Sequence, residues 1–440
     1  MGRGLVNRVS RAAVVSPVPW LLCILALLVL VVPLIVFGAN NALLATVAAT
    51  LQALVAVIVV LCARDIVPAF WARLSPAAVL FALMLLAGVL FILGIGGPTS
   101  PFGRASALVE LVKLAGCGGV FLTFAILATE RGRLRSIIAL MAIFGGGYAL
   151  VSLWLFQEDP SHVFGVAKGL RVERFTGTLM NANVAGCVFG VFALLTFGWL
   201  QALVVQRRWS LGAFAGLILV LCLAALTRTQ SRTAFALTFI LVLVLLGSWL
   251  LRNTPSQRFG RFAIAGLVVI SLGIVAVAAG GPLLSRFGLL QADWNTRMMS
   301  FSIYSAVAAD APAWGFGMGT FSRIHAMLLL PGNATLLWDL NAAHSAPVQF
   351  LLEAGPVMSV LFGGALAYLV TFVISSRARP TGLQFAAAVA SIVLIVGCSL
   401  VDIALNVPAV AALAAALGGL VFGACAAPYA LQSQSARSQA

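Results

Sequence analysis

The chain has 440 residues, of which 62% are hydrophobic and only 8% are charged, and its mean hydropathy is +1.12. Soluble globular proteins carry about 25% charged residues because their surface faces water. The composition therefore excludes a soluble enzyme, a secreted disulfide scaffold and a disordered chain, and it predicts a protein whose solvent is a lipid bilayer.

The charges point in the same direction. The 26 Lys and Arg residues outnumber the 11 Asp and Glu residues, which gives a formal net charge of +15. A nucleic-acid-binding protein would gather these cations on one soluble face, but here they lie singly or in small groups between apolar runs, as topology signals do. We expect membrane lipids as partners and no nucleic acid. The seven cysteines form no C-x-x-C pair, so neither a disulfide framework nor a metal site is indicated.

A helix that crosses a bilayer needs about 20 apolar residues. Apolar runs of about that length lie near residues 20–38, 43–62, 76–97, 106–128, 136–156, 183–205, 211–226, 229–250, 263–281, 348–374, 384–405 and 407–427. The first run is long enough to be a retained span and not a cleaved signal peptide. We predict an all-α polytopic membrane protein in which residues 1–440 form a single integral membrane domain with about twelve transmembrane helices.

The distribution of cations predicts the orientation. If the N-terminus is cytoplasmic, 16 of the Lys and Arg residues lie on the inner side and nine lie on the outer side, as the positive-inside rule requires. The even number of spans then places both termini in the cytoplasm.

Two predicted outer segments, 157–182 and 282–347, are long, whereas the other connections are short. The second contains residues 294–309, in which Trp294, Met298, Phe301 and Ser305 share one helical face. We predict an amphipathic helix there, on the outer surface. Loops of this size are usually functional. No internal repeat is visible in the sequence, which argues against the interpretation that the protein is an inverted-repeat transporter.

The first long outer segment ends in a cluster of polar residues. Three cations, Lys168, Arg171 and Arg174, precede Asn181 and Asn183 at the start of the sixth apolar run. Asn183 is either an ordinary helix N-cap or part of an anion site, since the amides at a helix N-terminus favour a phosphate.

Two further arginines lie on the outer side. Arg232 leads directly into an apolar run, so it is either a functional residue near the membrane surface or a side chain that reaches back to the lipid headgroups. Arg297 precedes the string Gly315-Phe316-Gly317-Met318-Gly319. No strand precedes this string, so a dinucleotide site is not expected, and the glycines predict a tight backbone turn.

His344 lies where the second long segment meets the tenth run. It is either an interfacial polar residue or a general base, because the pKa of histidine is close to neutral pH. Glu110 and Lys113 are spaced as an ion pair on one helix. Asp402 is expected to cap a neighbouring helix or to meet an outer arginine.

Four motifs now occur in order on the predicted outer face: R-F-x-G-x-x-x-N-x-N at 174–183, S-R at 231–232, Arg297 with the glycine string that ends at Phe321, and H-S-x(7)-E-x-G at 344–355. In this order they resemble the O-antigen ligase/polymerase superfamily, and the overall plan is most similar to the O-antigen ligases of Gram-negative bacteria. Ser345 departs from the Asn that polymerase-like relatives often carry.

The resemblance implies a GT-C-like glycosyltransferase in the bacterial inner membrane with a periplasmic active site. The donor would be undecaprenyl-pyrophosphate-linked O-antigen, the acceptor a sugar hydroxyl of lipid A–core, and the reaction inverting and independent of metals and cofactors. His344 would be the base, and Arg232 and Arg297 would bind the pyrophosphate. The remaining candidate substrate-binding residues are Lys168, Arg171, Arg174, Asn181, Asn183, Arg323 and Glu353.

Three alternatives stay open. An O-antigen polymerase shares the donor, the face and the motifs. A protein O-glycosyltransferase of the same superfamily is the second alternative, although such proteins usually carry an added C-terminal domain. A secondary transporter with twelve spans is a different class, and it would place ionisable residues at mid-membrane.

Overall fold

The computed structural model describes residues 20–63, 67–95, 101–169, 172–251, 266, 290–338, 340, 342–376, 380 and 382–437. Within these ranges, ten helices are long and apolar enough to cross a membrane. They are α2 (Ala42–Cys62), α3 (Val67–Ile92), α4 (Pro101–Leu127), α5 (Arg131–Glu158), α6 (Ala182–Val205), α7 (Trp209–Arg228), α8 (Arg232–Leu250), α13 (Ala346–Ser375), α14 (Leu383–Val401) and α15 (Pro408–Arg437). A shorter apolar helix, α1 (Trp20–Ile35), precedes them.

The protein is therefore an all-α, multi-pass membrane protein, as its apolar runs predict. Eleven of the twelve predicted runs coincide with these helices. The remaining run, 263–281, lies outside the described residues except for position 266.

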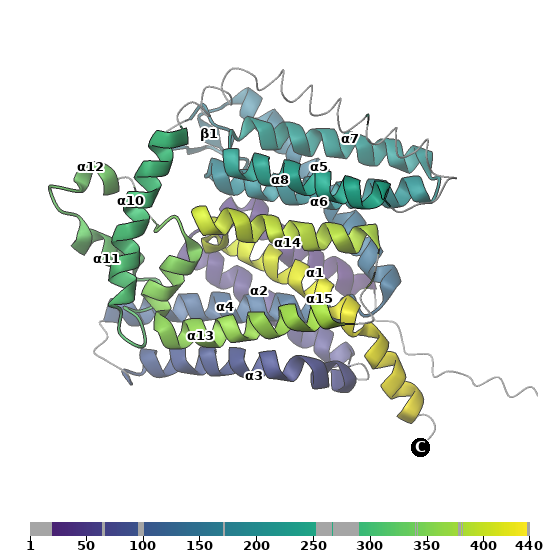
Figure 1. The fold of residues 1–440 in the computed structure, drawn as a ribbon, viewed down its shortest axis with the longest axis horizontal. Helices are drawn as coiled ribbons and strands as arrows, with labels where there is room; N and C mark the ends of the chain where they lie inside the picture. Colours follow the sequence, from purple (N-terminus) through teal and green to yellow (C-terminus); the bar gives the residue numbers. More distant parts are fainter. Residues whose placement is uncertain are drawn as a thin grey trace, which may run out of the picture.

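The remaining elements gather near one end of the bundle (Figure 1). They are the 3-10 turns η1 (Phe37–Ala39) and η3 (Ala404–Asn406), the hairpin β1 (His162–Val163) with β2 (Val166–Ala167), and the helices α10 (Leu290–Ala309), α11 (Phe321–Leu328) and α12 (Ala334–Leu337). The two strands pair antiparallel, with His162 opposite Ala167. The predicted helix over 294–309 is present as α10, and in Figure 1 it runs across the ends of the long helices.

Helix α6 lies at the centre of the second half of the bundle. Nearly all of its residues are buried, and it packs against α5, α7, α8 and α14. A helix that is apolar on every side is suited to such a position. The peripheral helices expose large apolar side chains, such as Leu61 on α2 and Val360 on α13. This pattern fits a protein whose outer surface faces lipid and not water.

Small residues bring α4 close to both α2 and α15. An added Cβ on Gly116 of α4 would lie 2.7 Å from the backbone of Ala49 in α2. Gly423 of α15 touches the backbone of Ala125 in α4 in the same way. Such contacts are typical of membrane helices, where close backbone packing replaces the hydrophobic effect as the main source of association.

The described parts of the connections 159–181, 229–231, 310–345 and 402–407 meet at the end of the bundle that α10 crosses (Figure 1). We call it the outer end, following the cation count. It holds the polar side chains described next.

Candidate functional site

Asp402 is the centre of a polar cluster at the outer end. It directly follows α14, and its side chain is 8% exposed. Oδ2 accepts hydrogen bonds from Asn183 Nδ2 at 2.6 Å and from an Arg297 guanidinium nitrogen at 3.3 Å, while Oδ1 lies 3.5 Å from His344 Nδ1. We call Asn183, Arg297, His344 and Asp402 the Asp402 cluster. The fold thus brings together four residues that are far apart in the sequence.

The Asp402 carboxylate stays charged despite its burial. Burial alone would raise its pKa, but the neighbouring His344 imidazole, the Arg297 guanidinium and the hydrogen bond from the Ile403 amide hold the pKa below its usual range. An ionised carboxylate in this position stabilises positive charge on both partners. The cluster can therefore orient the imidazole and keep a negative charge beside it.

His344 is held in place by its backbone. Its φ is +50°, a left-handed conformation that is rare for a residue with a side chain and that is often found at functional sites. The residue before it, Ala343, donates its amide to Gln349 Oε1 at 3.2 Å, and the same oxygen accepts from Asn406 Nδ2 at 2.6 Å. The side chain is 25% exposed, so part of the ring remains accessible.

Arg297 lies on α10 and reaches the Asp402 cluster from there. Its second guanidinium nitrogen donates to the Val401 carbonyl at 2.8 Å, at the C-terminus of α14, where the helix dipole favours a cation. On the same helix Trp294 and Met298 are exposed, whereas Tyr304 is fully buried. The guanidinium side chain is 34% exposed, so it can also reach a ligand.

The first long outer segment positions Asn183. Asn181 is the N-cap of α6, since its side chain accepts from the amides of Asn183 and Val184. The N-cap reading of Asn183 is therefore wrong. The side-chain nitrogen Nδ2 of Asn183 instead donates to Asp402, and its side-chain oxygen Oδ1 accepts from Arg174 at 2.8 Å.

Arg174 ties two outer segments together. It is buried, and its guanidinium donates to the Thr229 carbonyl at 3.0 and 3.2 Å as well as to Asn183. Thr229 belongs to the tight turn before α8, in which Gln230 has a φ of +54°. Arg232 is the first residue of α8 and is half-buried, so Arg174 links the segment that carries Arg232 to the Asp402 cluster.

The glycine string forms the predicted tight turn. Its amides pair with carbonyls that a break in α13 leaves without helical partners. Pro356 has no amide to pair with the Leu352 carbonyl, and α13 breaks at Gly355, whose φ is +73°. The Phe316 and Gly317 amides donate to the carbonyls of Leu352 and Glu353, both at 3.0 Å. Buried backbone groups need such partners inside a membrane. The string therefore docks the second long segment onto α13.

Glu353 takes part in this docking. Its Oε1 accepts from the Phe321 amide at 2.8 Å, at the start of α11. Glu110 and Lys113 form the predicted ion pair at 2.7 Å, and an added Cβ on Gly319 would lie 3.2 Å from Glu110 Cγ. We call Glu353, its Phe321 contact and the turn at Gly315 and Gly355 the Glu353 dock.

The other candidate residues are separate from the Asp402 cluster. Lys168 donates to the Arg174 carbonyl at 3.3 Å, and Arg323 is exposed on α11. Arg171 lies outside the described residues. Substrate contacts of all these side chains stay predictions.

Sequence reasoning named Asp402 only as a residue that caps a helix or meets an arginine, and the second of these is confirmed. It missed that Asn183 and His344 face the same carboxylate, and it gave Gln349 no role. The available signal was an acid near the outer end of the apolar run 384–405. Among the described residues, no three His, Cys, Asp or Glu side chains come together as metal ligands.

No protein-family model and no curated protein sequence matches the chain.

Proposed function

We propose that the protein is a membrane-embedded glycosyltransferase of the O-antigen ligase type. It would transfer a glycan from undecaprenyl pyrophosphate to a sugar hydroxyl of lipid A–core, at the periplasmic face of the bacterial inner membrane. The observation that carries the proposal is the Asp402 cluster, because it joins a partly exposed histidine to a partly exposed arginine through one buried carboxylate.

His344 is suited to the role of general base. Its Nδ1 faces Asp402, which leaves Nε2 for the acceptor hydroxyl. Nε2 takes the hydroxyl proton while the oxygen forms a bond to the anomeric carbon. The bond from that carbon to the phosphate oxygen breaks, and its electron pair leaves with the pyrophosphate. Attack from the face opposite the leaving group inverts the anomeric configuration. Asp402 is a positioning residue that stabilises the resulting imidazolium.

Arg297 and Arg232 would stabilise the leaving group. Negative charge grows on the pyrophosphate as the bond breaks, and a planar guanidinium can donate two parallel hydrogen bonds to phosphate oxygens. Arg297 is already held at the cluster by Asp402 and the Val401 carbonyl. Arg174, Asn181 and Asn183 would fix the shape of the donor site, because their described contacts are with the protein itself.

An apolar recess supports a lipid-linked donor. Between α7 and α8, a small apolar recess extends from Leu226 and Phe235, near the outer end, to Leu219 and Val242. It begins within a turn of Arg232, so an isoprenoid chain in the recess would bring its pyrophosphate near that residue. Apolar chains bind in such spaces through the hydrophobic effect.

Two other functions remain candidates. A polymerase would use the same donor and cluster but would extend the glycan. A secondary transporter would depend on ionisable groups within the spans, such as the Glu110–Lys113 pair.

One reconstitution experiment tests these functions. Purified protein would be mixed with undecaprenyl-pyrophosphate-linked glycan and lipid A–core in EDTA, and the products would be separated on a gel. We expect glycan-bearing lipid A–core. Longer lipid-linked glycan alone would indicate a polymerase, and no product from either acceptor would contradict the proposal.

A further inference from the structure

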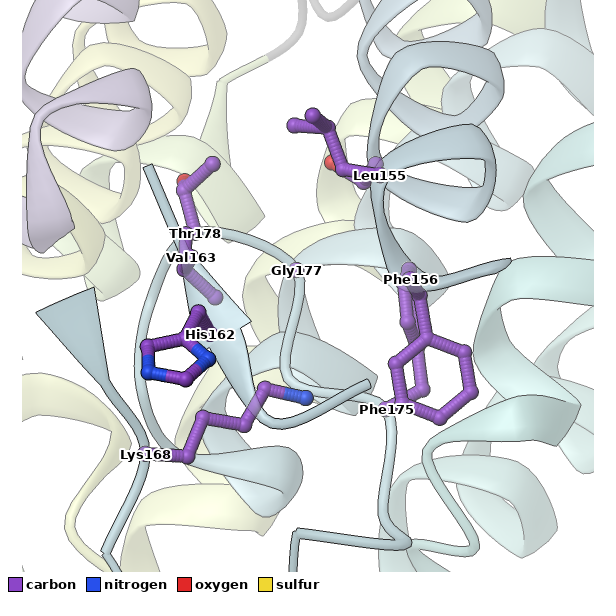
Figure 2. A pocket seen from close by; sticks show the side chains of 9 residues that line it. Leu155, Phe156, His162, Val163, Lys168, Phe175, Gly177 and Thr178 are labelled. Atoms are coloured by element: carbon purple, nitrogen blue, oxygen red, sulfur yellow. The ribbon is translucent and has the colours of Figure 1, made fainter. Parts of the chain in front are cut away.

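One side of α10 exposes apolar side chains, although α10 is not one of the ten long apolar helices. These side chains are Trp294, Met298 and Phe301. The apolar surface beside the β1–β2 hairpin is different. Figure 2 shows the ring of Phe175 in a small pocket with Lys168, and the surrounding protein buries this ring. The part of the chain that the structure describes provides no such cover for the exposed side of α10.

The exposed apolar side chains of α10 form an uncharged face. Trp294, Met298 and Phe301 follow one another at spacings of four and three residues, which places them on the same side of a helix. Arg297 is the only charged residue between positions 294 and 309, and its guanidinium turns to Asp402. We call Trp294, Met298 and Phe301 the α10 face.

Two other sides of α10 are covered by protein. Tyr304 and Ala308 belong to an apolar cluster that also contains Ile324 of α11, Leu337 of α12 and Leu352 of α13. In Figure 1, α13 lies on the bundle side of α10, whereas α11 and α12 lie on the side away from the long helices. The α10 face, which remains exposed, therefore points sideways out of the flank of the protein, along the membrane plane.

The helix next to α10 is open to lipid. Among the ten long apolar helices, α13 has the smallest buried share, and its Val357 and Val360 are exposed. Helix α10 packs against the outer part of α13, where Leu352 lies. The α10 face thus lies beside a lipid-exposed helix, at the level where the spans leave the bilayer. Tryptophan is enriched at that level, because its ring is apolar and its N–H can meet the headgroups.

We propose that the α10 face is a lipid-binding surface, which lies at the boundary between the acyl chains and the headgroups of the leaflet at the outer end. The apolar side chains of the face then leave water, which the hydrophobic effect favours. Helix α10 becomes an in-plane helix that holds the second long segment at the membrane.

Lipid contact of the α10 face also sets the depth of the Asp402 cluster. Arg297 precedes Met298 by one residue, so a helix with Met298 in lipid holds the Arg297 guanidinium at headgroup level. A substrate that reaches this guanidinium therefore has to be carried by a lipid or to approach along the membrane surface. This consequence rests on the proposed function, whereas lipid contact itself does not.

Thiol labelling of the full-length protein in phosphatidylcholine nanodiscs tests the proposal without any transfer step. Met298→Cys on the α10 face is compared with Met327→Cys on α11. The native side chains are 43% and 68% exposed, a difference too small to change a rate tenfold. A membrane-impermeant sulfonated maleimide reacts with thiolates in water, so Met298→Cys should react at least about tenfold more slowly than Met327→Cys. Peptide mass spectrometry separates both sites from the native cysteines, and the two rates should become equal after unfolding in SDS.

Photocrosslinking of the wild-type protein supplies a measurement that needs no substitution. The nanodiscs then contain phosphatidylcholine with a diazirine on its acyl chain, and labelled peptides are mapped after irradiation. We expect label on residues 294–301 and on α13 around Val360, and none on α11.

Slow labelling of Met298→Cys together with acyl-chain crosslinks to the α10 face supports the proposal. Equal maleimide rates for the two folded variants overturn it, because the face would then be in water. Slow labelling without crosslinks also overturns it, because a second copy of the chain or another protein would then cover the face. If Met298→Cys does not fold, the wild-type crosslinks decide. Lipid contact in a protein that transfers no glycan would contradict only the proposed function.

Discussion

Asp402 and Glu353 are both acids at the outer end of the helix bundle, but they hold different kinds of groups. Asp402 faces three side chains, those of Asn183, Arg297 and His344. Glu353 accepts from a backbone amide, that of Phe321. A carboxylate that orders other polar side chains sets the geometry of possible chemistry, whereas one that binds backbone sets the position of a loop. We therefore expect changes in the Asp402 cluster to alter transfer itself, and changes in the Glu353 dock to act through stability.

The largest effect should follow the loss of the base. His344→Ala removes the only group of the cluster that can accept a proton at neutral pH, so transfer should fall by about 10²–10⁴-fold. Donor binding should be kept, because Asp402 still holds Arg297. Initial rates and donor affinity would be measured separately.

His325→Asn is a matched control. His325 Nδ1 contacts the Tyr304 hydroxyl at 2.8 Å, and an asparagine retains a polar atom for that contact. Its transfer rate should be close to that of the wild type. Near-normal transfer by His344→Ala at pH 7 would instead make His344 an ordinary interfacial residue.

Asp402→Asn should have the next largest effect, a loss of transfer on the order of 10²-fold. The variant keeps the size of the side chain but removes the charge that favours an imidazolium at His344. We expect the maximal rate to fall while donor affinity stays close to that of the wild type, because Asp402 acts on the chemical step through His344. A merely structural role would instead lower the melting temperature and weaken donor binding as well.

The same carboxylate contributes to stability with a defined pH dependence. Its pKa in the folded protein is below the usual value near 4. A group with a depressed folded pKa stabilises the protein above its unfolded pKa, and this stabilisation is lost as the pH falls through the folded value. Acid unfolding below about pH 4 should therefore be less steep for Asp402→Asn than for the wild type.

Arg297→Lys and Arg232→Lys should each slow transfer on the order of tenfold. Lysine keeps the charge but cannot reproduce the planar pair of donors. Because the charge on the leaving group grows in the transition state, the rate should fall more than donor binding. The control is Arg135→Lys, an exposed residue at the inner end. If the outer variants behaved like this control, general attraction to lipid phosphates would explain both arginines.

The sequence predicts the helices and the glycine turn well, because these depend on local patterns. Runs of about 20 apolar residues identify spans directly, and Gly315 and Gly355 are suited to positive φ. The Asp402 cluster is different, since Asn183 and Asp402 are 219 residues apart. No local pattern reports which outer residues share a carboxylate.

Arg174 shows a second reason for the difference. An arginine in a basic loop predicts a phosphate ligand, but this guanidinium is buried against the Thr229 carbonyl. Every residue type has a backbone carbonyl, so the type of residue at position 229 carries no signal. Partners made by backbone groups become visible only in the folded structure.

Within the Glu353 dock, Gly355→Ala should destabilise the protein by about 1–3 kcal/mol. Its φ of +73° is strained for alanine, and the added Cβ would meet the backbone of Gly315 and lie 2.6 Å from the Ala313 carbonyl oxygen. Gly363→Ala, in the same helix with open space around it, should be neutral or stabilising by about 0.5–1 kcal/mol. Thermal unfolding in detergent would compare the two. Equal melting temperatures would contradict the docking role of the turn.

The smallest effect should come from Glu353→Gln. The glutamine carbonyl oxygen can still accept the hydrogen bond that Glu353 Oε1 receives from the Phe321 amide. If the carboxylate serves only the dock, stability should change by less than about 0.5 kcal/mol and transfer by less than about twofold. If Glu353 binds substrate through its charge, as the resemblance implies, transfer should fall while the melting temperature stays constant. Glu353→Ala supplies the comparison, because it removes the acceptor and leaves the Phe321 amide unpaired, which costs about 1–3 kcal/mol. Loss of stability in Glu353→Ala together with normal transfer in Glu353→Gln would assign this residue to the loop, and would leave Asp402 as the acid on which the chemistry depends.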